Sequence, residues 1–309
     1  MINIFITNDE NKLSEISHAQ KGCWIEVTDP TDEEAALLVE NYKINRSFLK
    51  AALDDQETAH LEQSEDQTLI MIDCCISSDR EKNNIPQYET APISLILFDS
   101  FFMTITRKGA QFLNALKENE EEPIDTRDPV SFFLILMKQI SEKFQEELRT
   151  ISSYCDEITD HLFKKMKNEG LMQMMKLDKS LIFFSSSLQA NQNLLEKIQE
   201  TRPFELSDPN EKLLDENLVE YRQASKMCNL YISVNERISD GCSNILSNSM
   251  NIVVERLTII TIVFSIPAII FGFYGMNVKS LNLQHAWLPI FLALGGSILC
   301  WIIFYRKRR

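Results

Sequence analysis

The sequence predicts an α+β, mainly α-helical membrane protein, with an α/β domain at the N-terminus, a long helical stalk and two transmembrane helices at the C-terminus. Short β-rich runs alternate with helical ones in residues 1–125, and helical sequence with few breaks follows in residues 126–256. Residues 257–276 and 286–305 each run for twenty positions without Asp, Glu, Lys or Arg. A helix needs about 20 residues to cross roughly 30 Å of hydrocarbon. The third predicted domain is therefore 257–309.

The N-terminal domain is predicted to contain strands and helices in alternation. Residues 31–42 and 46–54 are expected to be helical, and residues 29–34 (DPTDEE) give the first of them an N-cap and an acidic first turn. Residues 99–100 (Asp-Ser) are expected to form a two-residue hairpin turn. The strand candidates are short and rich in β-branched or aromatic residues. They are residues 23–27, 68–75, 93–98 and 101–106.

The stalk begins after an acidic, proline-containing linker at residues 118–125. Asp128 and Pro129 then supply an N-cap and a proline at the first helical position. Helical sequence continues to Thr201, and a break near residues 168–170 divides it into two antiparallel helices of about 40 and 30 residues.

A single long helix is expected to lead from the stalk into the membrane. Residues 208–209 (Asp-Pro) repeat the N-terminal cap, and only Gly241 and Pro267 interrupt the helical sequence before Gly272. A proline is tolerated inside a membrane helix. If continuous, this helix has about 65 residues and is roughly 100 Å long.

The two apolar stretches predict a helical hairpin in the lipid bilayer. Only the outer loop, residues 277–285, separates them, so both ends of the chain lie on one side. Residues 306–309 (RKRR) form a basic tail, which by the positive-inside rule places both termini in the cytoplasm. The first twelve residues do not resemble a signal peptide. We expect a multi-pass protein of the inner or plasma cell membrane.

Composition separates an acidic region from a basic end. The first 255 residues hold 45 acidic and 25 basic side chains, a net charge of about −20, and we expect no nucleic-acid partner. Seven cysteines without regular spacing suit a reducing compartment better than disulfides or a zinc site. We expect no enzyme, because no nucleophile–base pairing, glycine-rich phosphate loop or metal-ligand cluster is evident.

A stripe of polar or small residues runs along one face of the long helix. Polar groups facing lipid are unfavourable, so the stripe must face other helices or water. Because two helices cannot enclose water, a water-filled path requires several copies around an axis, that is, a cyclic homo-oligomer. The stripe consists of Asp240, Asn244, Asn248 and Asn251 in the stalk, followed by Thr258, Thr261, Ser265, Ala268 and Gly272; the apolar Val254 is also expected to line the path.

Simpler explanations of this stripe stay open. Thr and Ser hydroxyls often bond back to their own helix, and small residues let helices pack closely. The asparagines suit a solvated or register-setting face of a helical bundle equally well.

The outer end of the same helix carries Tyr274, Gly275, Met276 and Asn277. Glycine lets the backbone leave the helix, and Asn277 offers a carbonyl and an amide to a hydrated cation. The sequence resembles the CorA-type magnesium transporters, in which a Gly-Met-Asn triplet, usually after Tyr, ends the first of two C-terminal membrane helices.

The resemblance extends over nearly the whole chain. The short loop and the basic tail also match the family. Residues 24–30 (WIEVTDP), followed by Glu33 and Glu34, are similar to its N-terminal domain, and residues 93–97 (ISLIL) to a later strand.

The resemblance implies a funnel-shaped homopentamer whose first membrane helices line a pore for divalent cations. Gly275, Met276 and Asn277 would form the selectivity filter, Asn251 would line the pore at the cytoplasmic side, and Asp240 would lie at the stalk entrance. Mg²⁺ is then the expected ion, taken up down its electrochemical gradient.

The resemblance also implies gating by cytoplasmic Mg²⁺ at acidic sites between protomers. Glu216 and Asp79 would bind this regulatory metal, although ordinary surface charge in a very acidic domain explains both residues as well.

Alternatives remain both for the transported ion and for the class of function. The family's outer loop often carries acidic residues, whereas residues 277–285 have none and include Lys279. Co²⁺, Ni²⁺ and Zn²⁺ stay open, since the ZntB-type zinc transporters share the architecture, although histidine and cysteine are absent from the stripe. A membrane-anchored oligomeric sensor without transport is the alternative of a different class.

Overall fold

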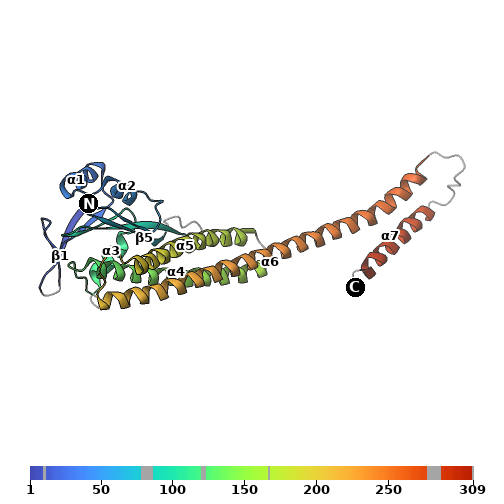
Figure 1. Ribbon diagram of the computed structural model, residues 1–309. Helices are drawn as coiled ribbons and strands as arrows, with labels where there is room; N and C mark the ends of the chain where they lie inside the picture. Colours follow the sequence, from blue (N-terminus) through green and yellow to red (C-terminus); the bar gives the residue numbers. More distant parts are fainter. Residues whose placement is uncertain (10–11, 78–85, 120–122, 166–167, 277–286, 308–309) are drawn as a thin grey trace. The chain divides into compact units, whose positions relative to one another are not determined.

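A computed structural model describes the chain from Met1 to Lys307, apart from residues 10–11, 78–85, 120–122, 166–167 and 277–286 (Figure 1). The chain divides into two units, Met1–Ser239 and Asp240–Arg309, and each is described by itself.

The first unit is built on a seven-stranded mixed sheet with the order β2-β1-β3-β7-β6-β5-β4. Neighbouring strands are antiparallel except β3 and β7, which are parallel, with Ile25 opposite Met103. The four predicted strands correspond to β3, β5, β6 and β7, whereas β1, β2 and β4 were not predicted. The strands are β1 (Ile2–Thr7), β2 (Leu13–Glu15), β3 (Trp24–Thr28), β4 (His60–Gln63), β5 (Thr68–Ser77), β6 (Tyr88–Leu97) and β7 (Phe102–Thr106).

Helices cover both faces of this sheet (Figure 1). Leu38 of α1 and Phe48 of α2 are buried in one core with Ile25 and Met103 of the sheet. On the other face, α4 and α5 contact β5, and α3 packs against α4. The helices of this unit are α1 (Asp32–Tyr42), α2 (Arg46–Ala52), α3 (Ala110–Glu118), α4 (Pro129–Lys165), α5 (Asn168–Thr201) and the first part of α6 (Asp208–Tyr274).

Local sequence signals account for several of the element ends. Thr31 and Glu34 form a reciprocal capping box at the start of α1. The Asp128 carboxylate accepts a hydrogen bond from the Ser131 N–H at 2.9 Å and so caps α4. The Phe98 N–H donates to the Phe101 carbonyl at 3.0 Å, so the two residues between them form the predicted turn of the β6–β7 hairpin.

One predicted break is confirmed, one predicted helix end was wrong and one helix was missed. The break expected near residues 168–170 is confirmed, because α4 ends at Lys165 and α5 begins at Asn168. Helix α2 ends at Ala52 instead of continuing to residue 54. Helix α3 was not predicted, although its apolar residues Phe112, Leu113 and Leu116 have helical spacing and are all buried.

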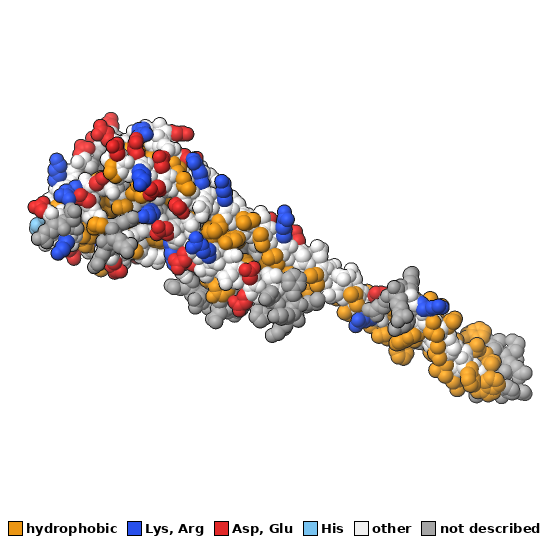
Figure 2. Space-filling view, turned by 90° about the horizontal axis from the view of Figure 1, so that it is seen from below, with side chains coloured by type: hydrophobic (Ala, Val, Ile, Leu, Met, Phe, Trp, Pro, Cys, Tyr) orange, Lys and Arg blue, Asp and Glu red, His pale blue; other side chains and the backbone are white. Residues whose placement is uncertain are grey.

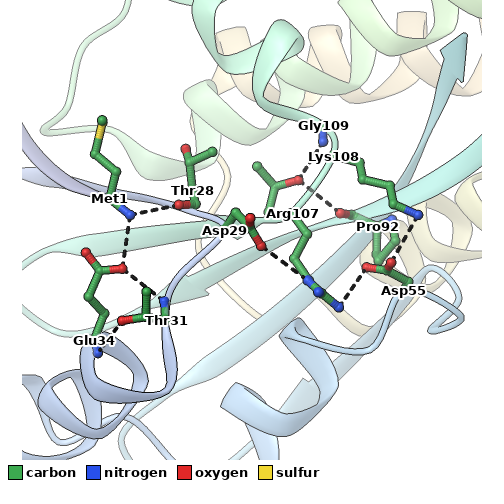
Figure 3. A network of polar contacts seen from close by, with 11 residues as sticks. Met1, Thr28, Asp29, Thr31, Glu34, Asp55, Pro92, Arg107, Lys108 and Gly109 are labelled. Carbon is green, nitrogen blue, oxygen red and sulfur yellow. Dashed lines mark hydrogen bonds and ion pairs between the residues drawn. The ribbon is translucent and has the colours of Figure 1, made fainter. Parts of the chain in front are cut away.

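A polar network joins the ends of the two parallel strands (Figure 3). Asp29 follows β3 and accepts a hydrogen bond from Arg107, which follows β7, at 3.5 Å. Arg107 and Lys108 both pair with Asp55, at 3.6 and 3.0 Å. The Gly109 N–H donates to the Thr106 hydroxyl at 2.8 Å. This network ties the loops after β3, α2 and β7 together.

Helix α6 has 67 residues, and its first part packs on α4 and α5 within the first unit. The Tyr221 hydroxyl donates to the Met137 carbonyl of α4 at 3.0 Å, and the Cys228 thiol to the Leu181 carbonyl of α5 at 3.3 Å. The rest of α6 and α7 (Trp287–Lys307) make up the second unit.

Candidate functional site

The two C-terminal helices are long enough and apolar enough to cross a bilayer. Their large hydrophobic side chains are mostly exposed, as Phe264, Ile269 and Phe291 illustrate at 73%, 70% and 66%. Figure 2 shows hydrophobic side chains gathered over this end of the chain, whereas charged side chains crowd the first unit. Because so much exposed apolar surface is unfavourable in water, we assign both helices to the membrane.

Helix α7 covers one face of α6 in the second unit. The Ser297 hydroxyl of α7 donates to the Val263 carbonyl of α6 at 3.2 Å. Gly296 lies so close to α6 that a Cβ atom there would be 2.9 Å from Ile266 Cγ2. Four half-buried residues share this face of α6 by helical spacing. They are Ile259, Val263, Ile266 and Ile270.

The predicted stripe lies on the opposite side of α6. Its members in the apolar stretch are all exposed. At 100° per residue, the centre of the stripe is about 150° from the centre of the face that contacts α7. The stripe is therefore free to contact water or neighbouring molecules. Its members in the apolar stretch are Thr258, Thr261, Ser265, Ala268 and Gly272.

The hydroxyl groups of the stripe bond back to their own helix. Thr258 donates to the Val254 carbonyl, Thr261 to the Leu257 carbonyl and Ser265 to the Thr261 carbonyl, each at 2.8 Å. This is the simpler explanation that the sequence left open.

A hydroxyl group that donates to its own helix can still accept hydrogen bonds, because it has one hydrogen and two lone pairs. With the hydrogen directed at the helix, the oxygen is left as an acceptor on the exposed face. Waters bound to a cation direct their hydrogens outward, so an acceptor-lined surface suits a hydrated cation and disfavours an anion.

The stalk side of the stripe is also exposed. Asp240, Asn244, Asn248 and Asn251 are exposed on α6, and the Val254 side chain is 55% exposed. These residues continue the polar surface from the apolar stretch toward the first unit along the sequence.

The predicted filter lies partly within the described residues. Helix α6 ends at Tyr274, two residues before the predicted end. The Gly275 N–H donates to the Phe271 carbonyl at 2.9 Å and the Met276 N–H to the Phe273 carbonyl at 3.3 Å, so both residues lie in the closing turn of the helix. Asn277 lies outside the described residues.

The predicted regulatory pair is only half described. The Glu216 carboxylate is 55% exposed and lies 3.7 Å from Lys212 Nζ, one turn earlier on α6. Asp79 lies outside the described residues. Among the described residues of a single chain, no group of three or more His, Cys, Asp or Glu side chains is arranged to hold a metal ion.

Sequence reasoning did not identify the contribution of α7. Ala293, Gly296 and Ser297 face α6, the first almost fully buried and the other two half-buried. Small residues at a spacing of three or four are typical of close helix packing in membranes, and this signal was present in the sequence.

Comparisons with known proteins agree on one architecture. A curated relative, the cobalt/magnesium transport protein CorA of Methanocaldococcus jannaschii, is 26% identical over 310 residues, covering 97% of this chain and 94% of the relative. The complete structure of the CorA magnesium transporter from the same organism superposes with a TM-score of 0.78 at 21% identity, covering 100% of this chain and 98% of that chain.

The structure of a cytoplasmic domain alone also resembles much of this chain. The ZntB cytoplasmic domain from Vibrio parahaemolyticus gives a TM-score of 0.64 at 12% identity, covering 80% of this chain and 98% of that chain. At such identities the two superpositions establish the fold alone.

A family profile decides the assignment. The profile described as "CorA-like Mg2+ transporter protein" matches residues 19–308, nearly the whole chain. Its members are transporters and not enzymes, which confirms the expectation from the sequence. The chain therefore belongs to the CorA-like Mg²⁺ transporter family.

Proposed function

We propose that this protein conducts Mg²⁺ across the membrane along the stripe of α6, at the centre of a ring of identical chains. The observation that carries the proposal is the position of the stripe, which is exposed, turned away from α7 and lined by hydroxyl oxygens free to accept hydrogen bonds. Five copies is the number that the family resemblance implies.

The chemistry of the stripe suits Mg²⁺. This ion prefers six oxygen ligands and gives up its water reluctantly. Neutral oxygens hold the ion through its water shell, weakly enough for it to leave again. The membrane potential drives uptake, at about 2.3 kcal/mol per charge per 100 mV, or about twice that for a divalent ion. We place both termini in the cytoplasm, and a cytoplasm-negative potential drives the cation inward.

The outer mouth is assigned to Gly275, Met276 and Asn277. The first two residues close the last turn of α6, so Asn277 follows directly on the end of the conduction path. Its amide and carbonyl would bind the water shell of the entering ion. Lys279, two positions further along, opposes cation capture and predicts a weak apparent affinity.

Gating is assigned to Mg²⁺ bound between protomers. Glu216 supports this role because its carboxylate is exposed and its pairing with Lys212, at 3.7 Å, is loose. A metal ion that joins Glu216 to Asp79 of a neighbouring copy only in the closed state would stabilise that state as internal Mg²⁺ rises.

Ion uptake into proteoliposomes tests the proposal. The full chain should admit Mg²⁺, and the panel should include Co²⁺, because a curated relative is named for cobalt and magnesium transport, as well as Ni²⁺ and Zn²⁺. Asn277→Ala should reduce uptake at least tenfold. Asn282→Ala, which changes the same residue type in the same loop, is the matched control.

Two results would contradict the proposal. Uptake that is equal in Asn277→Ala and Asn282→Ala would remove the filter assignment. Assembly that depends on Mg²⁺, without flux of any ion in the panel, would instead identify a membrane-anchored sensor.

A further inference from the structure

Pro267 creates a defect in the hydrogen bonding of α6. It lies inside the helix, within the segment assigned to the membrane. A proline has no N–H, so the carbonyl four residues earlier loses its donor within the helix. In α6 that carbonyl belongs to Val263. An unsatisfied carbonyl is costly in hydrocarbon, where no water replaces the missing donor.

The missing donor is replaced from the other helix. The Ser297 hydroxyl of α7 donates to the Val263 carbonyl at 3.2 Å. This is the carbonyl that Pro267 leaves without a partner. Gly296, the residue before Ser297, lets α7 approach α6 closely enough for this bond, because a Cβ there would lie 2.9 Å from Ile266 Cγ2.

The choice of acceptor distinguishes Ser297 from the other hydroxyls of the hairpin. Thr258, Thr261 and Ser265 donate to carbonyls of their own helix, as hydroxyl side chains in helices commonly do. Ser297 donates across to α6. Val263 lies eleven residues before the end of α6 and Ser297 ten residues after the start of α7, so the bond joins the middle of both spans.

We propose that Ser297 is a positioning residue for the conduction helix, whose hydroxyl substitutes for the N–H missing at Pro267. The bond holds α7 against α6 at the one point where the helix lacks its own hydrogen bond and is therefore able to bend. It fixes how the outer part of the stripe, Ala268 and Gly272, is presented relative to the inner part. The effect on transport rests on the proposed function, whereas the bond itself does not.

The bond is tested directly by NMR on the full-length protein in lipid. Val263–Phe264 is the only Val–Phe pair in the sequence, so ¹³C-carbonyl valine combined with ¹⁵N phenylalanine isolates the Val263 carbonyl resonance. Ser297→Ala should move this resonance to lower frequency, and Ser297→Thr should leave it near the wild-type position.

A double-mutant cycle tests the link to the proline. Pro267→Ala restores the N–H inside α6, so in that background Ser297→Ala should move the Val263 resonance by less than half as much. A resonance that does not respond to Ser297→Ala in the presence of Pro267 would overturn the bond. Equal responses in both backgrounds would overturn the link to the proline.

Uptake measurements test the positioning role. Ser297→Ala should change the rate of Mg²⁺ uptake about threefold, the size expected for one interhelical hydrogen bond in a membrane. Ser297→Thr should restore the rate, and the change should vanish in the Pro267→Ala background. Cys300→Ala, one turn further along the same helix, is the matched control.

The outcomes separate this inference from the proposed function. A shifted Val263 resonance with unchanged uptake would overturn the positioning role and leave the transport proposal intact. A wild-type protein without any uptake would contradict the transport proposal, while the Val263 resonance would still decide whether the bond exists.

Discussion

Asp73 is a carboxyl group in an unfavourable place for a charge. It lies in β5, is 5% exposed and accepts a hydrogen bond from the Ser187 hydroxyl of α5 at 2.8 Å. Burial raises the pKa of Asp73 to about 6, although the Ser187 hydrogen bond acts in the opposite direction. Because this folded-state pKa lies above the unfolded value, the stability it contributes is present below about pH 4 and is lost as pH rises through 6.

We therefore expect Asp73→Asn to stabilise the protein at neutral pH. At pH 7.5 the substitution should raise the free energy of unfolding by up to about 3 kcal/mol, and the gain should shrink toward pH 5, where the native carboxyl is mostly protonated. Thermal unfolding of the full chain in detergent at several pH values measures this. A stability difference between wild type and variant that does not change with pH would contradict the raised pKa of Asp73.

Gly109 occupies a site without room for a side chain. An added Cβ would lie 2.6 Å from Ile93 Cγ1 and 2.9 Å from the Thr106 hydroxyl oxygen. Gly109→Ala should therefore destabilise the first unit by about 1–3 kcal/mol, as overpacking of a core does. The melting temperature of the full chain measures this change.

Gly241 supplies the matched control for Gly109. A Cβ there meets nothing within 4 Å, and the residue lies inside α6. Gly241→Ala should leave the melting temperature unchanged or raise it slightly, since alanine favours helix more than glycine. Equal losses in the two variants would show that the close approach at Gly109 is not the cause.

At the scale of the element, the conduction face of α6 depends on its hydroxyl oxygens. Thr261→Val keeps the shape of the side chain and removes the acceptor that faces away from α7. Loss of one hydrogen bond to the hydrated ion, worth about 1 kcal/mol, should reduce Mg²⁺ uptake about fivefold, or more if several copies line the path. Helix content in circular dichroism should not change.

The control for this element is the neighbouring residue Ile262, an aliphatic side chain that is 36% exposed. Ile262→Val removes one methyl group and no acceptor, so its uptake should equal that of the wild type. If Thr261→Val conducted as well as Ile262→Val, the hydroxyl stripe would not be the path.

At the scale of the whole molecule, the acidic first 255 residues and the exposed Glu216 predict control by internal Mg²⁺. Glu216→Gln should raise the internal Mg²⁺ concentration that halves uptake, because one carboxylate is lost from each proposed intersubunit site. Glu200→Gln, an exposed carboxylate of α5, should not. Unchanged inhibition in Glu216→Gln would remove this residue from the gate, and native mass spectrometry would count the copies.

Much of the fold was readable because its signals are local. Residues 29–34 specified the α1 cap, Asp128 the start of α4, and the absence of charge the two membrane spans. The strands β1, β2 and β4 were missed because their stability comes from pairing with residues distant in the sequence, whereas the helical spacing of α3 was present and overlooked. The Thr7–Thr126 hydrogen bonds, across 119 positions, illustrate such a contact.

The sequence by itself determined that this protein has two apolar stretches long enough to cross a membrane, that a polar stripe enters the first of them and that the Gly-Met-Asn triplet ends it. These features follow from charge and helical periodicity, which act over a few residues. Only the tertiary structure decided that α7 covers the face opposite the stripe, and that Ser297 satisfies the carbonyl left by Pro267. The physical reason is that a hydrogen bond between residues 34 positions apart depends on how two helices pack, which no local pattern specifies.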